Sequence, residues 1–201
     1  MFMKFLVLYG FIICHLSCTI SDSKKLNTFK TLVTDTTRGQ FNDLEFGKWQ
    51  SSRLNIQQIN NGVDSFELRI WNFGMWARKE LVILRYFDNK WVTCNYDYWE
   101  NGKRVIDSLH LLCKQIDSNV AYKIQMFVTK DSILELPSQT AIPNFKDNTA
   151  DGNTYFIEIA TKTFYKTLGY HNPQYFNDPY NRQFLLLIHF LELYFNFFHT
   201  D

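Results

Sequence analysis

The middle of the chain consists of short runs in which apolar and polar residues alternate, and this pattern restricts the fold more than any other feature. In one run Phe66, Leu68 and Ile70 fall on one side of an extended segment, with Glu67 and Arg69 on the other. Similar runs cover residues 54–59, 65–71, 80–87, 91–99 and 108–114. Because turn residues separate the runs, we predict an antiparallel meander of about five strands.

Two turns are predicted from specific residues. Asn60-Asn61-Gly62 contains an Asn-Gly pair, which accepts the positive φ angles of a tight hairpin, and should join the runs 54–59 and 65–71. Asp88-Asn89-Lys90 should join the next two runs in the same way. A later pair of runs at 154–160 and 163–169 raises the expected total to about five to seven strands.

Apolar residues recur at helical spacing after the meander. The positions i, i+4, i+7 and i+8 of one helical face are held by Val120, Ile124, Phe127 and Val128. Ser118 is placed to cap the start of this helix, and Pro137 requires the helix to end before it.

Asp178-Pro179 predicts the start of a long C-terminal helix, since aspartate caps helices and proline suits the first helical position. The helix should reach about Phe198 and is apolar nearly all round, so it is either buried across the sheet or meets a partner. The predicted fold class is therefore α+β, an antiparallel β-meander packed with one middle helix and a long apolar C-terminal helix.

The N-terminus has the three-part build of a secretory signal. Lys4 precedes an apolar run at 5–13, and residues 15–21 are mostly polar and small. The apolar run is far shorter than the ~20 residues that cross a bilayer, so a permanent anchor is not expected. The alternative is that this run forms a buried first element of the domain. We predict a signal peptide over residues 1–18, a polar tether over 19–27, one domain over 28–201, and export from the cytoplasm.

The cleavage position decides the final location. Leu16-Ser17-Cys18 resembles a bacterial lipobox, in which the cysteine is lipidated and becomes the new N-terminus, although His15 departs from the usual pattern. Lipidation at Cys18 would anchor the domain to the cell envelope, because two or more acyl chains bind a membrane firmly. Cleavage near Ser17 or Ser21 would instead release a secreted or periplasmic protein, and both outcomes remain open.

Export also affects Cys94 and Cys113, because an oxidising compartment permits disulfides. The two cysteines lie opposite each other if the hairpin between them is centred at Lys103-Arg104. A turn at Asn101-Gly102 would offset them, so a disulfide and two separate buried thiols are both possible.

The charge balance restricts the partners. Lys and Arg total 21 against 20 Asp and Glu, and loss of Lys4 with the signal leaves 20 against 20. A protein without net charge has little long-range attraction for nucleic acid. We expect no nucleic-acid partner, and membrane contact only through a lipid anchor.

One loop matches part of a calcium site. Asp147, Asp151 and Glu158 fall at spacings found in EF-hand loops, whose oxygens surround Ca²⁺. Thr149 replaces one of the usual ligands, and Pro143 prevents the preceding helix, so a polar turn entering a strand is the favoured interpretation. No other metal, cofactor or catalytic motif is found, and we predict no cofactor and no catalytic residue.

The alternate positions of the run 91–99 combine aromatic and polar side chains. Trp91, Asn95, Asp97 and Trp99 would share one face of a strand, together with Thr93. Such a face suits stacking on a sugar ring or contact with a protein partner. The competing interpretation is that the same face packs beneath a helix or a loop.

Several segments are similar to stretches in uncharacterised exported proteins of Bacteroidota, many with lipoprotein-like signals. These segments are 66–71, Lys90-Trp91, 133–137 and 151–159. The resemblance implies a location in the bacterial envelope and transfers no site. We expect a non-enzymatic binding domain of the cell envelope, with a secreted hydrolase or other enzyme as the alternative.

Overall fold

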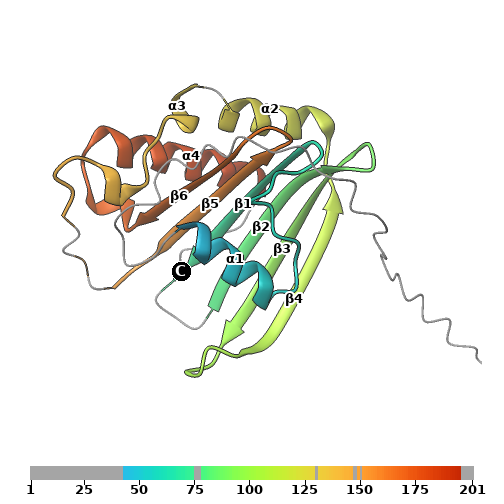
Figure 1. Ribbon diagram of the computed structural model, residues 1–201, viewed down its shortest axis with the longest axis horizontal. Coiled ribbons are helices and arrows are strands. Elements are labelled where there is room, and N and C mark those ends of the chain that lie inside the picture. The colour runs from blue at the N-terminus through green and yellow to red at the C-terminus, as the bar shows by residue number, and fades with distance from the viewer. Residues whose placement is uncertain (1–42, 75–77, 130, 147–148, 150, 196–201) are drawn as a thin grey trace, which may run out of the picture.

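The computed structural model describes residues 43–74, 78–129, 131–146, 149 and 151–195. The predicted signal, the tether and Cys18 lie outside these residues. Within them, a six-stranded sheet carries helices on both of its faces (Figure 1). The strands are β1 (Phe66–Phe73), β2 (Arg78–Phe87), β3 (Lys90–Glu100), β4 (Ile106–Gln115), β5 (Thr154–Thr161) and β6 (Tyr165–His171). The helices are α1 (Asp43–Arg53), α2 (Ser118–Thr129), α3 (Asp131–Leu134) and α4 (Pro179–Phe195), with short 3₁₀ turns η1 (Gln139–Ala141) and η2 (Pro173–Tyr175).

The sheet is antiparallel throughout, in the order β4-β3-β2-β1-β5-β6. Strands β1 to β4 form a meander, and the hairpin of β5 and β6 pairs with β1 on its other side. The predicted α+β class with an antiparallel meander is confirmed.

The predicted strand at 54–59 is wrong. This segment leaves α1, and the N–H group of Ile56 still donates to the carbonyl of Ser51 at 2.9 Å. Asn55 takes the left-handed conformation, with φ of 52°, which ends a helix and turns the chain away. Ile59 is buried beside β5 and β6, so the apolar spacing reflects burial of an irregular segment rather than a strand.

The start of α2 is capped by Asp117, not by Ser118 as predicted. The Oδ1 atom of Asp117 accepts hydrogen bonds from the N–H groups of Asn119 at 2.8 Å and Val120 at 3.2 Å. Ser118 is instead the first residue of the helix. Aspartate serves as the N-cap because its carboxylate reaches N–H groups that have no partner within the helix.

The start of α4 agrees with the prediction. The Oδ1 atom of Asp178 accepts hydrogen bonds from the N–H groups of Tyr180 and Asn181, both at 3.0 Å. Pro179 is the first helical residue, where its missing N–H is not needed. None of the helices in the described part of the chain has the length and apolarity needed to span a bilayer.

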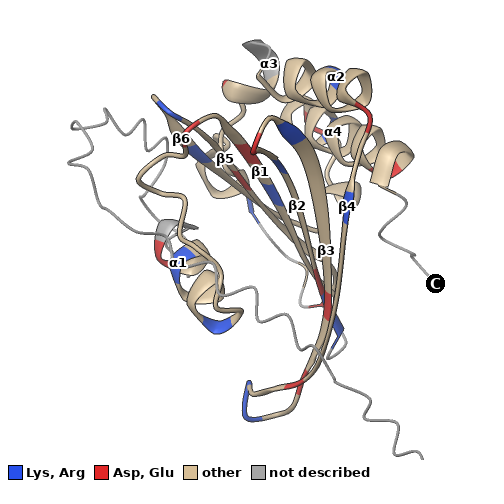
Figure 2. Ribbon diagram, turned by 90° about the vertical axis from the view of Figure 1, so that its right-hand side faces the viewer, with Lys and Arg blue, Asp and Glu red and all other residues tan. Residues whose placement is uncertain are grey.

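The sheet has two differently covered faces. We call one the helix face, because α2 and α4 pack on it, and the other the α1 face (Figure 2). The helix-face core joins apolar residues of the sheet with those of α4, among them Leu68, Ile70, Ile157, Phe184, Leu187 and Leu191. Figure 2 shows that α2 and α4 cover only the upper part of the helix face, and that the lower ends of β2, β3 and β4 extend beyond them.

Candidate functional site

A row of polar side chains crosses the strands on the helix face, close to the uncovered end of the sheet. We call it the polar row, and it consists of Asn72 in β1, Glu80 in β2, Asp97 in β3 and His110 in β4, each directly opposite the next. Opposite residues of antiparallel strands point to the same side with Cβ atoms roughly 4.5–5.5 Å apart. The row is therefore one continuous surface strip drawn from the whole meander.

An exposed aromatic ring adjoins the polar row. Trp99 of β3 lies opposite Arg78 of β2, one row closer to the end of the sheet, and remains 45% exposed. Large apolar rings are usually covered in a folded domain, so an exposed tryptophan beside charged groups is a candidate contact for a partner.

The predicted binding face is divided by the helices. Trp91 is only 8% exposed, and its ring packs 5.8 Å from the ring of Phe66 in the helix-face core. Asn95 and Asp97 are partly buried, and Trp99 at the far end of β3 is exposed. Packing therefore accounts for Trp91, and the open surface lies at the opposite end of the same strand.

Arg78 holds the two acidic residues of the polar row. Its Nε lies 3.0 Å from Oδ1 of Asp97, and its Nη2 lies 3.1 Å from Oε1 of Glu80. Asn72 donates from Nδ2 to the second oxygen of Glu80 at 3.4 Å. Partly exposed ion pairs contribute only about 0–1 kcal/mol each, so the main effect of Arg78 is to fix the positions of these carboxylates.

Three buried oxygens on the same face have no hydrogen-bond partner among the described residues. They are Oδ1 of Asn72, Oδ1 of Asn95 and Oγ1 of Thr93. A buried polar atom without a partner costs about 1–3 kcal/mol, and buried polar groups in folded proteins are almost always paired. All three atoms are covered from solvent, and they lie on the same face of the sheet as the polar row.

Helix α4 bounds the inner end of the polar row. Tyr155 lies opposite Asn72, and burial raises its pKa, with the charges of Glu192 and Glu80 raising it further. Glu192 of α4 and Glu80 of the polar row are therefore both within electrostatic reach of Tyr155. Burial also raises the pKa of Glu192 itself, against the effect of His189.

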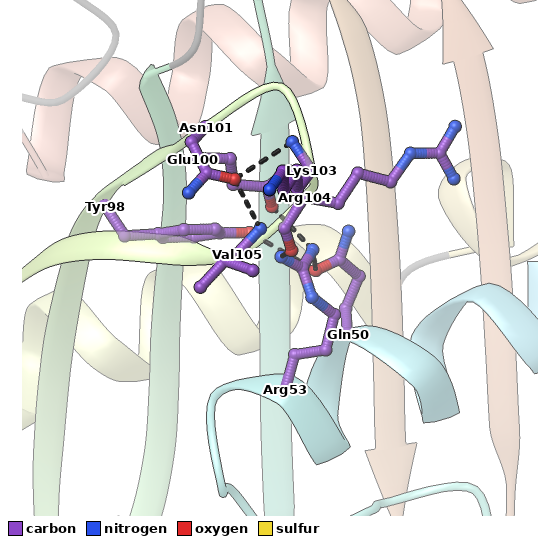
Figure 3. Close-up of polar contacts among 8 residues, drawn as sticks. All are labelled: Gln50, Arg53, Tyr98, Glu100, Asn101, Lys103, Arg104 and Val105. Carbon is purple, nitrogen blue, oxygen red and sulfur yellow. Dashed lines mark hydrogen bonds and ion pairs between the residues drawn. The ribbon is translucent and has the colours of Figure 1, made fainter.

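A second polar cluster lies on the α1 face and has a structural role (Figure 3). Nη1 of Arg53 in α1 lies 2.6 Å from Oε1 of Glu100, and its Nη2 donates to the backbone carbonyl of Arg104. Oδ1 of Asn101 accepts hydrogen bonds from two backbone N–H groups of the same loop at 3.0 and 3.1 Å. These contacts tie α1 to the loop between β3 and β4.

The buried charges beneath α1 are also paired. Nε of Arg69 lies 2.7 Å from Oε1 of Glu67, and its Nη1 donates to the hydroxyl of Ser51 at 2.8 Å. Arg69 is 2% exposed. A buried guanidinium with this many partners holds α1 on the sheet and leaves no open position for a ligand.

Glu158, which matches the last ligand position of an EF-hand loop, belongs to the same buried layer. Its two oxygens accept hydrogen bonds from the indole of Trp71 at 2.9 Å and the hydroxyl of Tyr165 at 2.7 Å. Asp151 is exposed in the bend before β5, and Asp147 lies outside the described residues. The structure thus uses Glu158 inside the core, and Asp151-Gly152 as a bend with a glycine φ of 140°.

Metal ligands are not grouped elsewhere in the described residues. No set of three or more His, Cys, Asp or Glu side chains suited to a metal ion occurs within them.

Cys94 and Cys113 face each other across β3 and β4 and are joined by a disulfide. Their sulfur atoms are 2.09 Å apart, and their Cα atoms 4.1 Å apart. The register that aligns them is the one expected for a hairpin centred at Lys103-Arg104. The disulfide secures β4, which forms one edge of the sheet.

Sequence reasoning found only the β3 part of this surface and missed Asn72, Arg78, Glu80 and His110. A signal was present for Glu80, because the two-residue turn at 88–89 pairs Phe87 with Lys90 and thereby sets Glu80 opposite Asp97. The position of the helices over the sheet has no comparable local signal.

Comparison of the chain with protein-family models, with curated proteins and with solved structures finds no match in any of the three.

Proposed function

We propose that this chain is an exported binding domain of the bacterial cell envelope, and that it holds a carbohydrate across the polar row with Trp99 stacked on a sugar ring. The observation that carries the proposal is the set of unpartnered acceptor oxygens on the helix face, with the exposed Trp99 at the uncovered end of the same face. Together they offer a flat apolar surface and hydrogen-bond acceptors in one strip.

The chemistry of the strip favours a sugar over a protein partner. Sugar hydroxyls donate hydrogen bonds, which the free oxygens of Asn72 and Asn95 need, and the C–H face of a sugar packs on an indole ring. The centres of protein interfaces are depleted in acidic residues, whereas Glu80 and Asp97 lie in the middle of this strip. Carboxylates pair readily with hydroxyl groups as acceptors.

Binding is favoured over hydrolysis by the position of Arg78. An acid and base pair needs one carboxyl group that can give up a proton and one that can take it. Arg78 contacts both Glu80 and Asp97, so both carboxylates are held in ion pairs with the same cation.

The binding experiment uses isothermal titration calorimetry with cellotetraose, chitotetraose and xylotetraose. Trp99→Ala should weaken binding of the best of these sugars at least tenfold, about 1.4 kcal/mol. The matched control is Trp49→Ala, which removes another exposed tryptophan on the α1 face and should bind as the wild type does. Equal losses in both variants, or no binding of any sugar by the wild type, would count against the proposal. Shortening of the sugar during the titration, detected by mass spectrometry, would favour the hydrolase alternative.

The location is tested separately by the intact mass of the protein recovered from its host. Export predicts loss of the N-terminal segment, and lipidation predicts a diacylated N-terminus at Cys18. A recovered chain that still begins at Met1 would contradict export.

A further inference from the structure

The two edge strands of the sheet, β6 and β4, differ in whether other parts of the chain cover their outward backbone groups. Along β6, the N–H group of Gly169 donates to the hydroxyl of Ser138 at 3.1 Å, and that of His171 donates to Oε1 of Gln139 at 2.8 Å. Side chains before and within η1 therefore satisfy this edge. Natural sheets cover or block their edges in this way because an open edge pairs with other strands.

Strand β4 has no such cover among the described residues, where β3 is the strand hydrogen-bonded to it. Nine of its ten residues are exposed, including Leu109 at 45%, Leu111 at 53% and Leu112 at 67%. The one register shift with β3 lies at its first residue, and the strand contains no proline. Its charged residues, Asp107 and Lys114, lie near its two ends, so its centre has none of the usual devices that prevent pairing.

The disulfide identifies which backbone groups point outward. Opposite residues about 4.5 Å apart at Cα form the non-hydrogen-bonded type of pair, against about 5.5 Å for the bonded type. Cys94 and Cys113 are 4.1 Å apart at Cα, so the N–H and C=O groups of Cys113 point away from β3. By alternation, so do those of Leu111 and Leu109, where the register with β3 is unbroken.

We propose that the free edge of β4 pairs with β4 of a second copy of this chain. A two-fold axis normal to the sheet makes such a contact self-complementary for any sequence, and its register is decided by which side chains come opposite each other. Leu109-His110-Leu111 is symmetric about His110. Pairing centred there sets each Leu109 opposite Leu111 of the other copy, so that four leucines form one apolar cluster on the α1 face, and the outward backbone groups bond one another.

The same register joins the binding surfaces. His110 is the outermost member of the polar row, and with His110 on the axis the row of one copy continues directly into that of the other. The dimer would present one strip with an Asn72 at each end and one Trp99 ring on each side of the axis. The dimer contacts do not depend on what the strip binds.

The test is a site-directed cross-link in the full chain. In the proposed register position 110 faces its own copy in a non-hydrogen-bonded pair, the arrangement that joins Cys94 and Cys113. His110→Cys should form an intermolecular disulfide on mild oxidation, at least tenfold more than Ser108→Cys, which lies on the same face but opposite Leu112. Mass spectrometry should identify the peptide containing position 110 joined to itself.

Sedimentation velocity provides an independent measurement without added cysteine. The wild type should sediment as a dimer, and Leu111→Lys, which places two charges in the leucine cluster but leaves the bonds to β3 intact, should sediment as a folded monomer. A monomeric wild type would overturn the proposal, whether the edge is bare or covered from within the chain. Equal cross-linking at positions 108 and 110 would overturn the register.

Discussion

Gly47 lies where α1 approaches the sheet most closely. A Cβ atom at this position would lie 2.7 Å from Oε1 of Glu158 and 3.2 Å from the ring of Phe156. The carboxylate cannot yield freely, because Trp71 and Tyr165 hold both of its oxygens. A glycine inside a helix normally costs about 0.5–1 kcal/mol of stability relative to alanine. The close approach of α1 to the sheet explains why position 47 is nevertheless a glycine.

We predict that Gly47→Ala lowers the free energy of unfolding by about 1–2 kcal/mol, since overpacking and displacement of a bonded carboxylate outweigh the gain in helix propensity. Urea denaturation measures the change. The matched control is Gly102→Ala, where an added Cβ meets nothing within 4 Å, and it should change stability little. Equal stability of Gly47→Ala and the wild type would contradict the close packing of α1.

The burial of Lys166 leads us to predict that the free energy of unfolding depends on pH in a specific way. Its Nζ donates to the carbonyl of Leu134, and burial lowers its pKa to about 8 against the opposing effect of Glu135. In the unfolded chain the pKa of lysine is about 10.4. Between these values the unfolded state binds more protons, so stability rises with pH.

The measurement compares the free energy of unfolding of the wild type and Lys166→Met from pH 7 to pH 10. The stability of the wild type should rise relative to that of the variant above about pH 8. Tyr170, whose pKa burial raises, is present in both proteins, so its ionisation in the unfolded state cancels in the difference. A constant difference across the range would contradict a desolvated Lys166.

Helix α4 depends on its first turn. Asp178 accepts hydrogen bonds from two backbone N–H groups there, and the helix supplies Phe184, Leu187 and Leu191 to the core. Asp178→Ala should reduce the free energy of unfolding by about 1 kcal/mol, as loss of a cap usually does. Asp178→Asn keeps an acceptor oxygen and should lose less, and chemical denaturation of both variants separates capping from general disturbance of the loop. Equal losses would argue against the cap.

Elements with strong local chemistry were predictable from the sequence. The alternation in β1 to β3, the turn at 88–89 and the Asp178-Pro179 start of α4 each depend on neighbouring residues. Residues 54–59 show the limit, because their apolar spacing suits either a strand or an irregular buried segment. The left-handed Asn55 that decides between them gives no separate periodic signal.

At the scale of the whole molecule, the candidate surface results from incomplete cover. The residues of the polar row come from four strands, and what exposes them is that α2 and α4 end before the sheet does (Figure 2). Strand registers follow from turns, but the placement of helices over a sheet depends on many distant contacts. The sequence therefore indicated Asn95, Asp97 and Trp99 without separating them from the buried Trp91.

The central claim is that a carbohydrate binds across the polar row, and the most direct measurement is an NMR titration of isotope-labelled protein with the tetrasaccharide that binds best. The side-chain amides of Asn72 and Asn95 and the indole N–H of Trp99 should shift saturably, because they lie at the proposed contact. The indole N–H of Trp49 on the α1 face should stay in place. Shifts centred on α1, or no shift with any of the sugars, would contradict the account.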